Sequence, residues 1–455
     1  MQLLSVNPAT GQILKRYDET DSLAVEKCLD RATRTQPAFA ALDVGERTGI
    51  LNRSAELLES RAGDYARLMT LEMGKPIGAA DAEVRKCARV CRWYAEHAGR
   101  LLADEAVETE ARRSFVRFEP LGIVLAVMPW NFPFWQVFRF AAPALAAGNA
   151  GLLKHASNVS GCALAIEEVF RDAGAPEGVF QTLLIASSRV EDLVRDPRVR
   201  AVTLTGSEPA GRAVAATAGD SLKKTVLELG GSDPFIVCAD ADLDRAIATA
   251  VTARTINNGQ SCIAAKRFLV ESDIAGEFEI RFRDAMAALK IGDPLDPEVQ
   301  IGPLATESIR DELAAQVEAT IAAGGKRLLG GEIPPGPGWF YPPTVVADPP
   351  PATPLRVEES FGPAAAILRF DSDEEAIALA NETDFGLGAS VWTVNRERAD
   401  RFISDVASGS VFVNAMVASD PRLPFGGIKN SGYGRELSEY GLREFLNIKT
   451  VWVEP

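Results

Sequence analysis

From residue 121 onward, short apolar runs alternate with segments whose apolar residues recur at helical spacing. Runs of this length, bounded by glycine, proline and polar residues, are typical of buried β-strands. The first five runs lie at 121–127, 150–154, 179–185, 201–205 and 225–229. Strands that alternate with helices in this way form a parallel sheet covered by helices on both faces. Such a sheet binds its ligands beyond the carboxyl ends of the strands.

A second series of the same kind predicts a second sheet. Its strand-like runs lie at 266–271, 364–370, 390–394 and 409–414, with helix-like segments between them. A stretch rich in glycine and proline, residues 330–344, is typical of a loop. The predicted fold class is therefore α/β, with two doubly wound parallel-sheet lobes and a cleft between them.

An excess of acidic residues argues against nucleic acid or an anionic membrane as the main partner. The 455 residues include 48 Lys and Arg against 63 Asp and Glu, which gives a formal net charge of −15. Nucleic acids and anionic lipids are bound by the opposite charge. The most apolar window, 132–153, contains Arg139 and two prolines, so we expect buried core there and no membrane span.

Cysteine and histidine usage indicates a reducing compartment and no metal site. Six cysteines in a chain of this length do not make a disulfide framework. The two histidines, His97 and His155, lie far apart and offer no zinc-binding spacing. The first residues show no charged region followed by an apolar stretch, so no signal peptide is expected. We expect a cytoplasmic protein whose thiols are free.

Cys262 is a candidate nucleophile on its local sequence. It lies in the segment NNGQSCIAAK, just before the strand-like run 266–271. A lone cysteine is more often an inert core residue, and this alternative stays open. The residues that precede Cys262 are polar or small, however, and a thiol at a loop-to-strand junction is a better nucleophile candidate than one inside an apolar run.

Two further polar residues stand at the ends of strand-like runs. Glu228 follows an apolar run and precedes two glycines, where burial would raise its pKa and suit it to act as a general base. The alternative is a strand-end carboxylate that faces water. Asn131 lies within PWNFPFW, where its amide would serve as an oxyanion donor or simply form a turn. The segment TGSEPAG (205–211) joins a strand to a helix whose N-terminus would attract a pyrophosphate.

Taken together, these segments resemble the NAD(P)-dependent aldehyde dehydrogenase superfamily. The similarity covers nearly the whole chain, and the motifs occur in the family's order. They are PWNFP (129–133), LLK (152–154), TGS with Gly211, ELGG (228–231), NGQSC (258–262), EESFGP (358–363) and PFGGIKNSGYGRE (424–436). Within the superfamily, the chain is most similar to the short bacterial succinate-semialdehyde dehydrogenases.

The resemblance implies a reaction and the residues that perform it. Cys262 would be the nucleophile, Glu228 the base and Asn131 the oxyanion donor. An aldehyde would be oxidised through a cysteine thiohemiacetal and a thioester, which water then hydrolyses. Contacts to the dinucleotide are implied for Met128, Pro129, Trp130, Lys154, Ser157, Gly206, Ser207, Glu359 and Phe361. A catalytically silent dinucleotide-binding protein, or transfer of the thioester to coenzyme A, would be the alternative functions.

The substrate prediction depends on a helix that we expect to begin near Phe134. Such a helix brings Gln136 and Arg139 onto one face, and the resemblance implies that this face lines the substrate tunnel, with Ser419 nearby. An arginine in an aromatic tunnel favours an anionic aldehyde such as succinic semialdehyde. Two alternatives stay open: Arg139 in a structural ion pair, and a medium-chain or aromatic aldehyde as substrate. Many semialdehyde dehydrogenases have a second arginine where this chain has Ile256.

The predicted cofactor is NADP, NAD or both. Where the superfamily usually reads KP[AS]E, this chain has Lys154, His155, Ala156 and Ser157. Ser157 stands where NAD-preferring members carry a glutamate that binds the ribose. The missing carboxylate removes repulsion towards a 2′-phosphate, and the Lys154 ammonium would attract it.

The resemblance also implies domain boundaries and self-association. Residues 1–107 and 120–230 would form the dinucleotide-binding domain, and residues 231–430 the catalytic domain. Residues 108–119 and 440–455 would form a β arm that pairs with a second subunit, giving a homodimer or homotetramer, since exposed strand edges need a partner.

Overall fold

The first series of apolar runs forms a six-stranded sheet in the computed structural model, which describes residues 2–454. The strand order is β19-β9-β8-β5-β6-β7, and all neighbours are parallel except β19, which is antiparallel to β9. The strands are β5 (Ile123–Met128), β6 (Ala150–His155), β7 (Phe180–Thr182), β8 (Val199–Thr205), β9 (Lys224–Glu228) and β19 (Gly432–Tyr433). The chain order reverses between β5 and β8, so a ligand crevice is expected beyond their carboxyl ends.

Helices cover both faces of this sheet because the strands are apolar on both sides. One face packs against α2 to α6, and the other packs against α1, α7 and α8. The helices are α1 (Ser22–Ala40), α2 (Val44–Ser60), α3 (Ala62–Met73), α4 (Ile77–Leu101), α5 (Trp135–Ala146), α6 (Ser160–Asp172), α7 (Val190–Arg195) and α8 (Glu208–Asp220).

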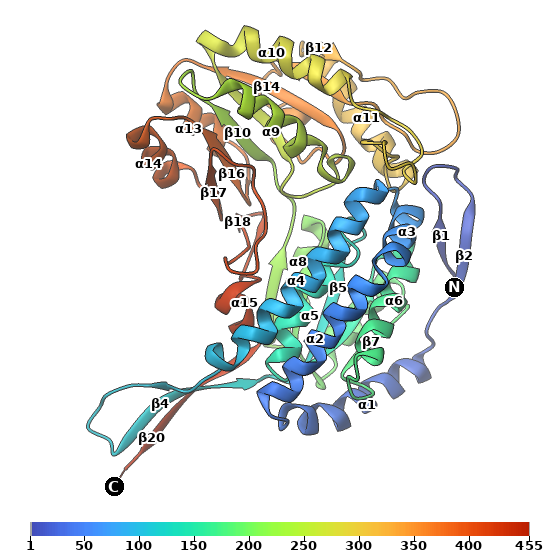
Figure 1. Ribbon diagram of the computed structural model, residues 1–455, viewed down its shortest axis with the longest axis vertical. Coiled ribbons are helices and arrows are strands. Elements are labelled where there is room, and N and C mark those ends of the chain that lie inside the picture. Colours follow the sequence, from blue (N-terminus) through green and yellow to red (C-terminus); the bar gives the residue numbers. More distant parts are fainter. Residues whose placement is uncertain (1, 455) are drawn as a thin grey trace.

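The second series forms a seven-stranded sheet in the other lobe, at the top of Figure 1. Its order is β12-β13-β14-β11-β10-β16-β17, and only β12 is antiparallel to its neighbour. The strands are β10 (Asp233–Val237), β11 (Ala265–Glu271), β12 (Lys326–Leu329), β13 (Thr344–Ala347), β14 (Ala364–Phe370), β16 (Ala389–Trp392) and β17 (Val411–Val413). The helices are α9 (Leu243–Thr255), α10 (Ser272–Ala287), α11 (Glu307–Ala322), α12 (Pro354–Val357), α13 (Asp373–Asn381) and α14 (Arg396–Asp405).

A three-stranded antiparallel sheet projects from the first lobe as an arm (Figure 1). It consists of β3 (Glu105–Ala106), β4 (Arg113–Pro120) and β20 (Leu446–Val453), with β4 in the middle. Between the second lobe and the arm, the chain returns to the first lobe through β19 and α15 (Ser438–Arg443). Two small antiparallel two-stranded sheets complete the fold: β1 (Gln2–Val6) with β2 (Ile13–Asp18), and β15 (Phe385–Gly386) with β18 (Ile428–Lys429).

The predicted fold class, two α/β lobes and a small β arm, is confirmed. It differs in one respect, because each large sheet is mixed and has one antiparallel edge strand. The strand β19 is antiparallel because it comes from the returning C-terminal segment and not from a strand–helix–strand crossover. Between residues 2 and 454, no helix has the length and apolarity that crossing a bilayer requires.

Candidate active site

A cavity of about 270 Å³ lies where the two lobes meet, and residues of both lobes line it. The first lobe contributes residues that follow the carboxyl ends of β5, β8 and β9, as the crossover rule predicts. The second lobe contributes α11 and the segments around residues 262 and 359. The lining consists of Pro129, Trp130, Asn131, Thr205, Gly206, Ser207, Leu229, Gly230, Cys262, Ile309, Glu312, Leu313, Gln316, Glu359 and Phe361.

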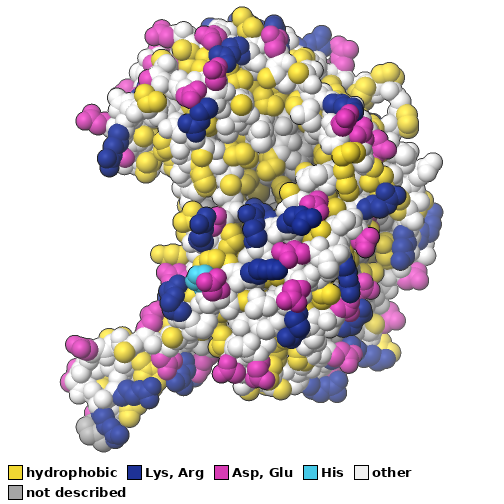
Figure 2. All heavy atoms as spheres, in the orientation of Figure 1, with side chains coloured by type: hydrophobic (Ala, Val, Ile, Leu, Met, Phe, Trp, Pro, Cys, Tyr) yellow, Lys and Arg dark blue, Asp and Glu magenta, His cyan; other side chains and the backbone are white. Residues whose placement is uncertain are grey.

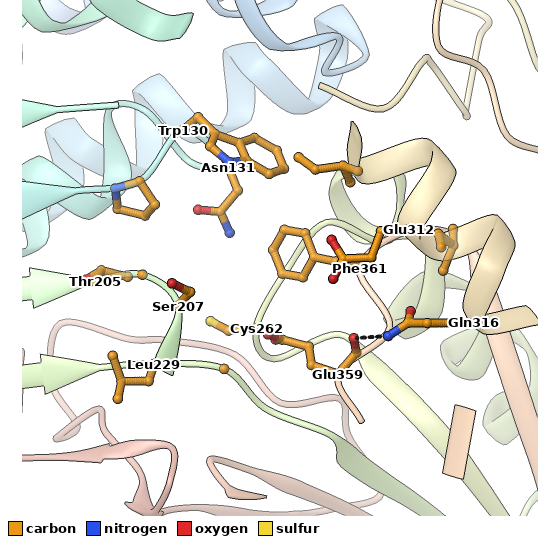
Figure 3. A pocket seen from close by; sticks show the side chains of 15 residues that line it. Trp130, Asn131, Thr205, Ser207, Leu229, Cys262, Glu312, Gln316, Glu359 and Phe361 are labelled. Carbon is orange, nitrogen blue, oxygen red and sulfur yellow. Dashed lines mark hydrogen bonds between the residues drawn. The ribbon is translucent and has the colours of Figure 1, made fainter. Parts of the chain in front are cut away.

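The Cys262 thiol lies at this cavity, on the turn between a 3-10 segment (Ile256–Gly259) and β11. Figure 3 shows its sulfur inside the cavity, with the Asn131 carboxamide pointing toward it. The residue is 9% exposed, so it is buried except for its access to the cavity. The inert-core alternative therefore does not describe its position.

The polar residues before Cys262 are buried, and they hold the turn in place. Asn257 and Asn258 adopt left-handed backbone conformations, with φ of 55° and 58°, which asparagine tolerates better than most residues. The Asn258 amide donates to the carbonyls of Gly74 and Pro303, 3.0 Å from each. Asn257 Nδ2 donates to the Asn131 carbonyl at 2.6 Å. Their polarity therefore supports the shape of the turn and does not indicate exposure to solvent.

Burial makes Cys262 a weakly acidic thiol. It raises the pKa of Cys262 to about 12, whereas the Arg139 and Lys266 cations act to lower this pKa. The Lys266 ammonium is itself buried and donates to the carbonyls of Ser261 at 2.9 Å and Cys262 at 2.6 Å. It also lies 3.6 Å from Glu359 Oε1, so one cation connects the Cys262 turn to Glu359.

The Asn131 side chain comes from the first lobe and crosses to the Cys262 turn. Its Nδ2 donates to the Gln260 carbonyl at 3.2 Å. The residue is 4% exposed and follows the rigid PW pair at the end of β5. A carboxamide held beside a thiol supplies an N–H donor near the point where an oxyanion would form.

Glu228 ends β9 and is 1% exposed. Burial raises its pKa to about 8, and the neighbouring Glu436 carboxylate acts in the same direction, whereas the Arg139 guanidinium opposes it. Glu228 does not line the cavity, but its charge acts on the Cys262 thiol. The position is that of a buried carboxyl group and not that of a strand-end residue in water.

Arg139 is a buried cation whose charge acts on the Cys262 thiol. It lies on α5, is 2% exposed, and forms a buried ion pair with Glu436. Its guanidinium also stacks 4.6 Å from the centroid of the Phe425 ring, and it does not line the cavity. Glu436, 297 residues away in sequence, supplies the carboxylate of an ion pair such as the alternative interpretation describes, and the substrate role of Arg139 stays a prediction.

The other two expected substrate residues also lie outside the cavity. Gln136 is 2% exposed on α5, and Ser419 is 8% exposed in the loop after β17. The Ser419 hydroxyl accepts a hydrogen bond from Lys86 Nζ at 2.7 Å. Sequence reasoning did not identify Lys86, because α4 reads only as an amphipathic helix.

The residues expected to bind the dinucleotide fall into two groups. Pro129, Trp130, Gly206, Ser207, Glu359 and Phe361 all line the cavity. Within this group, the rings of Trp130 and Phe361 meet edge to face at 5.6 Å. Met128, Lys154 and Ser157 lie outside the cavity lining.

A second, largely apolar cavity of about 290 Å³ lies between α7 and α8. Val127 lines it, and Lys154 is the register partner of Val127 on the next strand, so both side chains project from the same face of the sheet. Burial lowers the pKa of Lys154, and no acidic side chain in the described chain forms an ion pair with it. The full lining is Val127, Ser187, Ser188, Val190, Glu191, Val194, Leu204, Ala210, Ala213, Val214 and Thr217.

Comparison with known proteins assigns the family. The sequence profile of the aldehyde dehydrogenase family matches residues 2–451. The chain belongs to the aldehyde dehydrogenase family.

Similar proteins extend over the full length of this aldehyde dehydrogenase. A protein of Synechocystis sp. called "Probable succinate-semialdehyde dehydrogenase [NADP(+)]" is 56% identical over 453 residues, covering 100% of both chains. "Succinate-semialdehyde dehydrogenase [NADP(+)] 1" of Mycobacterium tuberculosis is 54% identical over 456 residues, again covering 100% of both. The crystal structure of succinic semialdehyde dehydrogenase from Streptococcus pyogenes in complex with NADP+ has a TM-score of 0.97 and 36% identity, and each chain covers 100% of the other.

Several site residues of this aldehyde dehydrogenase were not found by sequence reasoning. The α11 side chains Ile309, Glu312, Leu313 and Gln316 line the cavity although no motif marks them. Gln316 Nε2 donates to the Glu359 carbonyl at 3.2 Å (Figure 3). A helical pattern alone does not say which ligand a helix faces. The apolar residues of 190–217 that line the second cavity were likewise indistinguishable from core.

Proposed function

We propose that this aldehyde dehydrogenase oxidises succinic semialdehyde to succinate with NADP+. One observation carries this proposal: full-length identity of 54–56% to proteins named as NADP-dependent succinate-semialdehyde dehydrogenases. The chemistry is supported by the Cys262 thiol and the Asn131 amide, which meet at the cavity between the lobes, and by the buried Glu228 carboxyl group, whose charge acts on the thiol.

The proposed nucleophile is Cys262, whose thiolate adds to the carbonyl carbon of the aldehyde. The charges of Arg139 and Lys266 favour the thiolate form. As the sulfur–carbon bond forms, the carbonyl oxygen becomes an oxyanion, which accepts hydrogen bonds from Asn131 Nδ2 and the Cys262 backbone N–H. The chemistry that a bound dinucleotide supplies is hydride acceptance, which leaves a thioester on Cys262.

The proposed base for hydrolysis is Glu228. A carboxylate whose pKa burial raises to about 8 is a much stronger base than an exposed one. It takes a proton from water, the hydroxide oxygen attacks the thioester carbon, and the thiolate leaves. The products are the carboxylic acid and free Cys262.

The residues present fit a dinucleotide that carries a 2′-phosphate. The N-terminus of α8, with Gly206 and Ser207 before it, would hold the pyrophosphate, and the second cavity would take the adenine. Lys154, a buried ammonium without an acidic partner, and Ser157, which is exposed and uncharged, would face the 2′-phosphate. Glu359 and Phe361 would contact the nicotinamide riboside.

The arm supports a proposal of self-association. Strand β20 is an edge of its sheet, and Ile448 and Trp452 on it are 61% and 44% exposed. Pairing with a second copy, in a dimer or tetramer, would cover this edge. Size-exclusion chromatography with light scattering tests the assembly, and a monomeric mass would contradict it.

We place the enzyme in the cytoplasm because its six cysteines are free thiols.

The substrate proposal is tested by a panel of kcat/KM values. Succinic semialdehyde, glutaric semialdehyde, hexanal and benzaldehyde are each assayed with NADP+ and with NAD+. We expect succinic semialdehyde with NADP+ to give the highest value. A higher kcat/KM for hexanal or benzaldehyde would refute the proposed substrate, and a higher value with NAD+ would refute the proposed cofactor.

A further inference from the structure

The Lys266 ammonium binds the two peptide groups on either side of the reacting cysteine. Lys266 lies at the start of β11 and is 1% exposed. Its Nζ donates to the carbonyl oxygens of Ser261 at 2.9 Å and Cys262 at 2.6 Å, and Glu359 Oε1 lies 3.6 Å away. The three N–H groups of a protonated lysine therefore have three acceptors around them. A buried cation with this set of neighbours holds the backbone of the nucleophile from within the protein.

The peptide group between Ser261 and Cys262 contains the N–H that the proposed mechanism uses for the oxyanion. This peptide group is trans, so its C=O and N–H point in opposite directions. The Ser261 carbonyl accepts from Lys266 Nζ at 2.9 Å and from the Ala264 N–H at 3.1 Å. A carbonyl held by two donors fixes the plane of its peptide group. Lys266 therefore fixes the direction of the Cys262 N–H, which points away from the ammonium.

The Cys262 N–H itself has no acceptor among residues 2–454. Buried backbone N–H groups are nearly always paired, so an unpaired one beside a thiol is free to bind an atom of the substrate. The cation on the Ser261 carbonyl also polarises the amide, which makes its N–H a stronger donor. Lys266 thus acts on both the direction and the strength of this donor.

The Cys262 carbonyl is enclosed from a second side. A Cβ atom on Gly231 would lie 2.7 Å from this carbonyl oxygen, which is closer than such atoms pack. The Gly231 N–H donates to Glu359 Oε1 at 3.0 Å, and the same oxygen faces Lys266. Gly231, Glu359 and Lys266 therefore surround the carbonyl and leave the peptide group little freedom to rotate.

The charge of Lys266 has a separate effect on the thiol. Burial raises the pKa of Cys262, and the cations of Arg139 and then Lys266 oppose this rise. Burial also lowers the pKa of Lys266, whereas the carboxylates of Glu359 and Asp233 raise it. A test of the backbone contacts must therefore separate the amount of thiolate from the stabilisation of the oxyanion.

We propose that Lys266 is a positioning residue for aldehyde oxidation: by binding the carbonyls of Ser261 and Cys262, it aims and polarises the Cys262 N–H toward the developing oxyanion. The inference rests on the proposed function, whose chemistry it deepens. A lysine that only stabilised the turn would affect the amount of folded enzyme and not the rate of its reaction.

Two rates measured on the variant Lys266→Met separate these effects, both with saturating NADP+ at the same pH. The first is the single-turnover rate of NADPH formation from succinic semialdehyde at saturating enzyme, which requires the oxyanion. The second is the rate of inactivation by methyl methanethiosulfonate. In that reaction the Cys262 thiolate attacks the sulfenyl sulfur of the reagent and methanesulfinate leaves, so no oxyanion forms on a carbonyl.

The ratio of the first rate to the second removes the contribution of the thiolate. Loss of a whole oxyanion donor typically costs about 10²–10³ in rate. Because Lys266→Met leaves the N–H in place but releases its peptide group, we expect the ratio to fall at least about tenfold. Lys266→Arg, which restores a buried cation with N–H donors, should recover at least half of this loss on a logarithmic scale.

The adjacent residue offers a matched control. Arg267 is equally buried, but its guanidinium donates to the carbonyls of Ser232 at 3.0 Å and Ala380 at 2.9 Å, away from the Cys262 turn. Arg267→Lys should leave the ratio within about twofold of the wild-type value. Circular dichroism establishes that each variant is folded, and Lys266→Gln, which keeps a neutral N–H donor, replaces Lys266→Met if the latter does not fold.

A fall of the ratio by less than about tenfold in the folded variant would overturn the proposal. Equal losses in both rates are one such result, since they would mean that Lys266 acts only through its charge on the thiol. A wild-type enzyme that forms no NADPH from succinic semialdehyde, yet reacts with methyl methanethiosulfonate, would instead overturn the proposed function. The two failures are therefore distinguishable in the same set of assays.

Discussion

Replacing Arg139 with leucine tests whether this arginine is part of a buried ion pair. The substitution leaves Glu436, which is 4% exposed, without its cation, and it removes the positive charge that acts on Glu228. Both carboxyl groups would then bind protons more tightly, because the Arg139 cation that lowers the pKa of each is removed while burial still raises it. We expect a large loss of stability and an active site whose charge balance is changed.

The magnitude follows from the burial of the pair. Both side chains are at most 4% exposed, so solvent screening is small. Two unit charges in contact attract each other by about 5 kcal/mol at an effective dielectric constant of about 20. Removing one partner of a buried pair typically costs about 3–5 kcal/mol, because the other is left uncompensated. We therefore expect the free energy of unfolding to fall by about 3–5 kcal/mol.

Urea denaturation followed by tryptophan fluorescence measures this loss. The double variant Arg139→Leu with Glu436→Leu removes both charges, and we expect it to recover most of the stability lost by the single variant. Arg85→Leu is the matched control, since it breaks an ion pair whose arginine is 57% exposed. Such an exposed pair contributes no more than about 1 kcal/mol.

Two results would refute the reasoning. A loss below about 1 kcal/mol for Arg139→Leu would mean that the guanidinium is not a buried ion-pair partner. A double variant no more stable than Arg139→Leu would mean that the uncompensated Glu436 carboxylate is not the cause of the loss.

Three further predictions address the chemistry. Cys262→Ala should abolish oxidation yet still bind NADPH, as measured by the change in NADPH fluorescence on binding. Measurable turnover would contradict the role of Cys262. Glu228 has a pKa of about 8, so its protonation at lower pH disables the base. The rate of thioester hydrolysis should therefore rise about tenfold per pH unit up to about pH 8 and then level off. Glu228→Gln should lose this rise with pH and accumulate acyl-enzyme, which mass spectrometry detects. Ser157→Glu should lower kcat/KM with NADP+ at least about tenfold through repulsion of the 2′-phosphate, and an unchanged NADP+/NAD+ ratio would count against the cofactor site.

Much of the fold could be predicted because the spacing of apolar residues along the chain indicates which side chains are buried. The runs 150–154, 201–205 and 364–370 agree with β6, β8 and β14 to within two residues. The hairpin of β1 and β2 was not predicted, because β2 alternates poorly and is mostly exposed. The helix α11 carried no predicted role, since its part in the site comes from the packing of the second lobe.

Part of the site could also be predicted. The motif residues Cys262 and Asn131 were expected to converge, and the parallel topology places both at the same cavity. The polar turn before Cys262 was associated with reactivity, and the structure instead gives those amides buried hydrogen bonds. Short-range sequence identified the segment, and long-range packing determined what its side chains do.

The order of apolar and polar residues determined by itself that this chain builds two α/β lobes and brings its motifs to the strand ends, because strand and helix periods are local properties. Only the tertiary structure decided which charged and polar groups meet. Arg139 pairs with Glu436 across 297 residues of sequence, and Lys86 meets Ser419 across 333. The physical reason is that electrostatic partnership depends on distance in space and on burial, and neither is set by neighbours along the chain.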